Sequence, residues 1–162
     1  MNISDISATL VTLASELADG ASGGNNFMLN GGDVGLLASL DRLSPAQASA
    51  SAHGGATIAA HADHIAYGLS LINRWSAGER NPWADADWSQ SWRRTAVTDA
   101  EWKAVRDDLR AQARGWVEAL RTSREVQPME LNGLVGSIAH LAYHLGAIRQ
   151  IDAHVRGPKD GE

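Results

Sequence analysis

The chain has 162 residues, 44% of them hydrophobic, so it is long enough for one domain with a core and too short for two. Its formal net charge of −5 excludes the broad electropositive surface that binding to nucleic acid or anionic membranes requires. Cysteine is absent, which excludes disulfides, thiolate ligands and cysteine nucleophiles and leaves histidines and carboxylates for any metal site.

The first predicted helix covers residues 3–18, where isoleucine and leucine recur at steps of three and four until Gly20, which can end a helix. This N-terminal segment carries acids where a signal peptide has basic residues, and no apolar run in the sequence reaches membrane-spanning length. We therefore expect a cytoplasmic protein. The stretch "GASGGNNFMLNGGDVG" predicts a loop, after which Asp33 can cap a short helix through "GLLASLDRL".

Three further long helices are predicted downstream. Residues 56–75 form the second, and a capping box of Thr98 and Glu101 starts a third that runs to about residue 122. Pro128 suits the first turn of a fourth. Residues 77–97 break the helical pattern yet contain tryptophans, which predicts a loop that either covers a site or closes the open end of a bundle; closure is the commoner use of loop aromatics.

These elements predict an all-α fold: a single domain over residues 1–162 that forms an antiparallel four-helix bundle, with a long connection between the second and third long helices. No segment shows the alternation of a strand, and no repeat of fixed period is visible.

Four of the 6 histidines occur as two pairs, in "HADHI" at residues 61–65 and in "HLAYH" at residues 140–144. On helices, the pair His61 and His64 shares one face, and so does the pair His140 and His144. Two imidazoles one turn apart can bind one cation, and a third from a neighbouring helix completes a set that leaves positions open for a substrate. The alternative is a polar bundle core in which the histidines only form hydrogen bonds.

Small residues accompany both pairs. Gly133, Gly136 and Ser137 precede the second pair on nearby faces of its helix, and Gly68 lies one turn beyond His64. Because small side chains leave space beside a ligand set, we favour metal binding over a polar core.

The stretches "ATIAAHADHIAYGL" and "HLAYHLGAIRQ" resemble the second-helix and fourth-helix motifs of the DinB-like superfamily of metal-binding four-helix bundles, and the resemblance extends over residues 36–150. Carried over by position, it implies His64, His140 and His144 as metal ligands. His61 falls on a position that the family does not use as a ligand.

The resemblance also implies a function. Family members with an assigned activity use a divalent metal, such as zinc or nickel, to activate a low-molecular-weight thiol, so we expect a metal-dependent transferase acting on such a thiol. A metal-dependent hydrolase and a non-catalytic metal-binding or small-molecule-binding bundle are the alternatives. The expected partners are a small-molecule substrate and a second copy of the chain in a homodimer. No catalytic acid or base is assigned to Asp63 or Asp152, and the hydroxyls of Tyr67 and Tyr143 are candidates to reach the pocket.

Overall fold

The computed structural model describes residues 3–122 and 125–159, and over these ranges the chain is helical with no β-strand. The elements in chain order are α1 (Ile3–Asp19), α2 (Gly35–Asp41), α3 (Pro45–Ala48), α4 (Ile58–Ser76), the 3-10 helix η1 (Ser91–Arg93), α5 (Asp99–Arg121), α6 (Pro128–Ile151) and the 3-10 helix η2 (Ala153–Val155). The expected all-helical class is therefore confirmed. None of the described helices combines the length and apolar character needed to cross a membrane.

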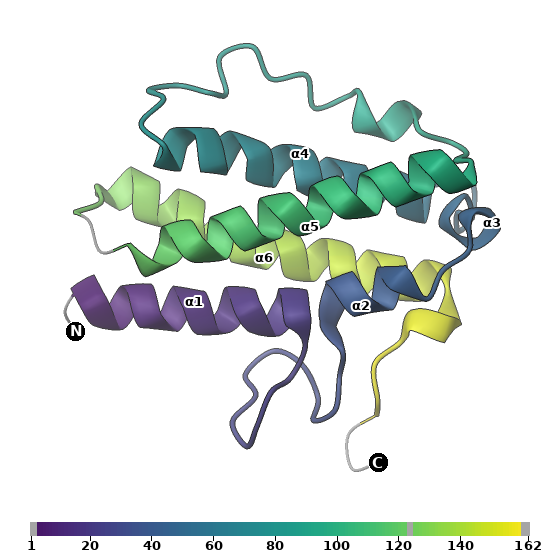
Figure 1. Ribbon diagram of the computed structural model, residues 1–162, viewed down its shortest axis with the longest axis horizontal. Coiled ribbons are helices and arrows are strands. Elements are labelled where there is room, and N and C mark those ends of the chain that lie inside the picture. The colour runs from purple at the N-terminus through teal and green to yellow at the C-terminus, as the bar shows by residue number, and fades with distance from the viewer. Residues whose placement is uncertain (1–2, 123–124, 160–162) are drawn as a thin grey trace.

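The four long helices lie side by side along the length of the molecule (Figure 1). Helix α4 packs on α5 and α6, and α1 packs on the same two helices from the other side. Figure 1 shows that α4 and α5 run in one direction while α1 and α6 run in the other. Because α4 and α5 are parallel, residues 77–98 return along the molecule before α5 begins.

The helix boundaries follow from capping residues in the sequence. Thr57 accepts a hydrogen bond from Ala60 N at the start of α4. Thr98 and Glu101 form the predicted capping box at the start of α5, and Pro128 occupies the first turn of α6 as predicted. The Thr57, Thr98 and Glu101 side chains accept from amide groups that have no partner inside the helix, and Pro128 has no amide that needs one, so each helix begins at these residues.

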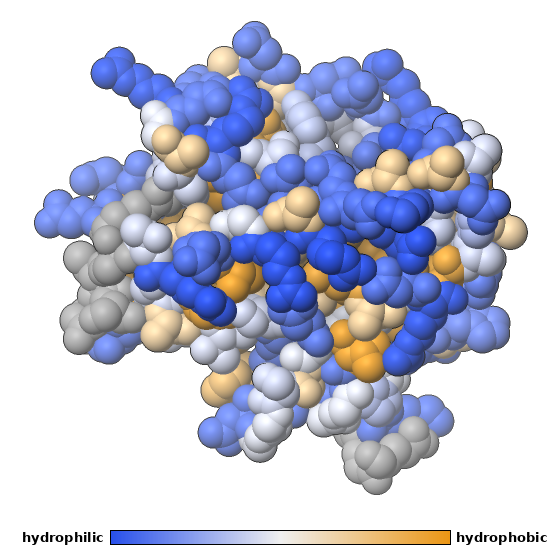
Figure 2. All heavy atoms as spheres, viewed as in Figure 1, coloured by the Kyte–Doolittle hydropathy of each residue, from blue (hydrophilic) through white to orange (hydrophobic). Residues whose placement is uncertain are grey.

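The core that positions the site lies between the long helices. Trp102 and Trp116 of α5 are both buried there, and the Trp102 indole donates to Leu43 O at 2.9 Å. Ile65 of α4 and Leu141 of α6, each next to a histidine of the site in the sequence, are also buried, which fixes the rotation of both helices. Polar side chains cover most of the face in Figure 2, with apolar side chains visible in gaps between them.

A buried carboxylate organises the loop after α1. Glu16, 7% exposed, accepts hydrogen bonds from the amides of Phe27, Met28 and Leu29 at 2.7–3.1 Å. The predicted stop at Gly20 is confirmed: α1 ends at Asp19, and Gly20 has φ +101°, where a Cβ would lie 2.3 Å from Asp33 O. The loop is thus tied to α1 by side-chain chemistry and by backbone geometry that only glycine tolerates.

Candidate metal centre

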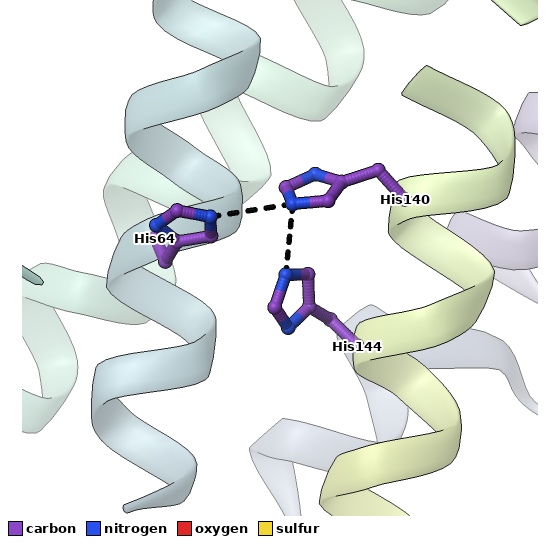
Figure 3. Close-up of side chains that lie close together, drawn as sticks. All are labelled: His64, His140 and His144. Carbon is purple, nitrogen blue, oxygen red and sulfur yellow. Dashed lines mark hydrogen bonds between the residues drawn. The ribbon is translucent and has the colours of Figure 1, made fainter. Parts of the chain in front are cut away.

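Three histidines from two helices meet at one point. Helix α4 provides His64, and α6 provides His140 and His144 one turn apart (Figure 3). His140 Nε2 lies 3.2 Å from His64 Nε2 and 2.9 Å from His144 Nε2. The nitrogens of the three side chains that could serve as ligands all lie within 4.8 Å of one another, so the structure brings together the set named from the sequence.

The three nitrogens fit a cation better than they fit one another. Each neutral imidazole nitrogen carries either one proton or one lone pair in the ring plane, so His140 Nε2 cannot form two well-aligned hydrogen bonds at once. Three imidazoles bound at about 2.0–2.1 Å to a tetrahedral cation would place their nitrogens about 3.3 Å apart. The observed separations of 2.9 and 3.2 Å need only a small expansion to reach that spacing.

The site holds its imidazoles in the neutral form that binds metal. His64 and His144 are 7% and 3% exposed. Burial, with the neighbouring imidazoles, lowers the pKa of His64 to about 4 and that of His144 to about 3. Burial also lowers the pKa of His140. At neutral pH no proton therefore has to leave these side chains before a cation binds.

His61 lies beside the three without joining them. Its Nδ1 is 2.8 Å from Nδ1 of His144, the ring nitrogen on the far side from the meeting point. The equivalent atom of His64, Nδ1, is buried without a hydrogen-bond partner among the described residues. His144 therefore has a side-chain hydrogen-bond partner at Nδ1, the ring nitrogen away from the meeting point, whereas His64 has none at its Nδ1 among the described residues.

The loop tryptophans cover the histidines. Trp92 stacks on His64 with ring centroids 4.3 Å apart and meets His61 edge-on at 5.5 Å. Trp88 lies 5.6 Å from His64. The Tyr67 hydroxyl accepts a hydrogen bond from Asp87 N at 3.0 Å and so ties this loop to α4. The sequence left two interpretations of this loop, a cover for the site or a closure of the bundle end. The structure favours the cover, because these rings contact the histidines directly.

A cavity of about 700 Å³ opens beside the histidines, between α4, α6 and the tryptophan loop. His64 and His140 form one part of its wall, and the small residues noted in the sequence, Gly68, Gly133, Gly136 and Ser137, form another. The remaining lining is mainly apolar: Ile65, Leu69, Ile72, Trp75, Trp83, Trp88, Met129, Glu130, Leu134 and Leu141. Sequence reasoning did not assign Met129 to this lining, and it gave the loop tryptophans a place at the site only as one of two alternatives.

Other candidates have structural partners elsewhere. Asp63 pairs with Arg94 at 3.3 Å, and Asp152 accepts hydrogen bonds from His154 N and Gln47 Nε2. Tyr143 is exposed, with its ring edge against His144 at 5.0 Å, and is not part of the cavity wall. The expectation that tyrosine hydroxyls reach the pocket is therefore not supported: the Tyr67 hydroxyl holds the loop, and Tyr143 points outward.

No protein-family model matches the chain, and neither a curated protein nor a solved structure matches it. The geometry of the histidines and the cavity is therefore the basis for assigning a function.

Proposed function

We propose that the protein binds one divalent metal ion, zinc or nickel, through His64, His140 and His144, and that it is a metal-dependent transferase acting on a low-molecular-weight thiol. The observation that carries the proposal is the convergence of the three side chains, two of which, His64 and His140, line a cavity large enough for a small molecule. When bound, a divalent cation held by three neutral imidazoles favours the thiolate form of a thiol at neutral pH.

The chain itself supplies three things to this reaction. Its neutral imidazoles bind the cation and add no negative charge, so the cation keeps its full positive charge toward a substrate. The cavity beside His64 and His140 gives a substrate a place next to the point where the imidazoles would hold the cation. The Trp92 ring stacked on His64 keeps bulk water from that side.

The test uses the full chain. Elemental analysis after loading with zinc or nickel should give one metal per chain, and cobalt-substituted protein titrated with cysteine, glutathione and simple organic thiols should show a sulfur-to-metal charge-transfer band. Turnover with a thiol and an electrophile should depend on the metal. Absence of bound metal would contradict the proposal. Hydrolysis of a simple ester or amide, with no response to any thiol, would establish the hydrolase alternative, and metal binding without turnover the non-catalytic one.

The proposal extends to architecture and assembly. The resemblance to the DinB-like superfamily supports a cytoplasmic four-helix bundle of α1, α4, α5 and α6, two helices running each way, with residues 77–98 as the long connection. It also supports a twofold homodimer. The exposed apolar side chains of Val135 and Tyr143 on α6 suit such an interface. Light scattering should give the dimer mass for the unaltered chain and for Ala111→Glu on α5, and the monomer mass for Val135→Glu.

A further inference from the structure

We infer that the cavity beside the histidines binds an apolar organic molecule, aromatic or alkyl, which carries a single metal-binding head group. The body of the ligand lies against the tryptophans and leucines, and the head group lies at His64 and His140. The placement of the head group rests on the proposed function; the apolar character of the body rests on the cavity wall alone. A sugar-like or peptide-like thiol is thereby disfavoured as the occupant.

Two polar side chains of the cavity wall already form hydrogen bonds within the helix α6 segment. Ser137 Oγ donates to Gly133 O at 2.7 Å, one turn back in the same helix. The Glu130 carboxylate accepts the Gln127 amide at 2.7 Å as part of the α6 cap. The other polar side-chain groups of the wall are the imidazoles at one end, the second carboxylate oxygen of Glu130 and the indole N–H groups, so the wall offers a ligand few hydrogen-bond partners for its area. A ligand with many hydroxyl, amide or charged groups would lose its water there and gain few hydrogen bonds in return.

The rest of the cavity wall consists mainly of tryptophan, leucine and isoleucine side chains, which favour contact with an apolar ligand. Trp83 and Trp88 enter from the loop and Trp75 comes from α4, with the Trp75 and Trp83 ring centroids 6.5 Å apart. Ile72 and Leu69 lie on the same helix as Trp75 and line the same cavity. Indole rings give a large contact area at low entropy cost, which suits an aromatic or alkyl body.

Glycines on α6 provide the space. Gly133 and Gly136 line the cavity, and a Cβ built on either would meet nothing within 4 Å, so the cavity reaches the helix backbone there. A Cβ on Gly68, on the opposite helix, would meet Trp88 at an ordinary contact distance of 3.6 Å. The Cβ of a leucine at position 136 would meet no protein atom, and the leucine side chain would occupy part of the cavity that the ligand needs.

The experiment uses the cobalt-loaded full chain and two sets of thiols. Phenylmethane-, phenylethane- and phenylpropanethiol form the apolar series, and cysteine and glutathione the hydrophilic set, with binding read from the charge-transfer band. Affinity should rise about fourfold per added methylene, as burial of one such group predicts. Gly136→Leu should weaken binding of phenylpropanethiol by at least about tenfold with the cobalt retained. Gly146→Leu, on the same helix and outside the cavity wall, should bind as the unaltered chain does.

The outcomes separate this inference from the proposed function. Tighter binding of cysteine or glutathione than of the apolar series, or an unchanged affinity in Gly136→Leu, would overturn the apolar ligand and leave the metal intact. If no cobalt binds, the proposed function fails, and the same apolar series is followed by tryptophan fluorescence in the metal-free chain. Binding that strengthens with chain length and is lost in Gly136→Leu would then support the cavity assignment, and its absence would overturn it. Should Gly136→Leu fail to fold, Gly133→Leu replaces it.

Discussion

His61 and His144 share a hydrogen bond between their Nδ1 atoms, 2.8 Å apart, although they lie on different helices. In the tautomer that binds a metal through Nε2, His144 carries its proton on Nδ1 and donates it to His61. His61 thus orients a ligand without being one, as a carboxylate or carbonyl does behind many metal-binding histidines.

The hydrogen bond between His61 and His144 predicts different losses of metal affinity for substitutions at His61 and at the three ligands. His61→Ala should retain one metal per chain with affinity weakened about 10–100-fold, because only the orientation of His144 is lost. Replacing His64, His140 or His144 by Ala should weaken binding far more, since two imidazoles make a poor site. Competition for zinc with a chromophoric chelator measures both effects, and His154→Ala on η2 is the control. If His61→Ala empties the site while His64→Ala does not, the ligand on α4 is His61.

The metal-free chain should lose stability as the pH falls from about 6.5 toward 4. His64 and His144 have pKa values lowered from 6.5 to about 4 and about 3, chiefly by burial. Between these values the unfolded chain binds protons that the folded chain does not, so the free energy of unfolding falls as pH falls. Urea denaturation between pH 7 and 5, above the range where most carboxylates titrate, measures the slope.

His144→Gln should reduce this slope, because one of the two histidines no longer takes part. Saturating zinc should raise the stability at pH 7, and the increment should shrink as protons compete for the imidazoles. Equal slopes for His144→Gln and the unaltered chain would contradict the depressed pKa of His144.

The helices and the two histidine pairs were predictable from sequence because their signals are local, whereas the choice of His64 over His61 as a ligand came from the resemblance to the DinB-like superfamily. The period of apolar residues and the caps at Thr98 and Pro128 define the helices within a few residues. The spacing of His140 and His144 guarantees a shared face on any helix, so their convergence does not depend on the rest of the fold.

The parts that sequence could not supply depend on how distant segments meet. The bond between His61 and His144 requires a particular register of α4 against α6, which no local pattern encodes. The stacking of Trp92 on His64 requires the path of residues 77–98, a segment without a helical period. The sequence signal for this cover was the repeated tryptophan itself, and it favoured closure of the bundle end over a cover for the site.

The contacts of Glu16 with the loop after α1 also could not be predicted from sequence, and they lead to a prediction about stability. Glu16→Gln should destabilise the chain by about 1–3 kcal/mol, because a neutral amide cannot accept all the backbone amides that the carboxylate now binds. Urea denaturation at pH 7 measures the loss, and Glu118→Gln, at an exposed position on α5, is the matched control. A loss no larger than that of Glu118→Gln would show that the loop after α1 does not need this charge.

The same residue predicts a response to acid. Burial acts to raise the pKa of Glu16, but the amides of Met28, Leu29 and Phe27 outweigh it, and the pKa lies below its ordinary value of 4.5. The stabilisation is therefore present above pH 4.5 and is lost as the pH falls through the lowered pKa. In Glu16→Gln this part of the acid-induced loss should be absent, which urea denaturation between pH 5 and 3 would detect.

Trp92 controls access to the metal if the loop covers the site as the ring contacts indicate. Its ring stacks on His64 and also lies 5.9 Å from His144, so it covers two of the three ligands. Trp92→Ala should speed the transfer of bound zinc to an excess of chelator while leaving one metal per chain. The substitution keeps the three histidine ligands and removes the indole ring that covers two of them. Trp83→Ala is the control, since that indole lines the cavity and has its ring partner in Trp75, away from the imidazoles. Equal release rates for Trp92→Ala and the unaltered chain would show that zinc leaves from the cavity side, past Gly68 and Gly136, and that the stacked indole does not limit its exit.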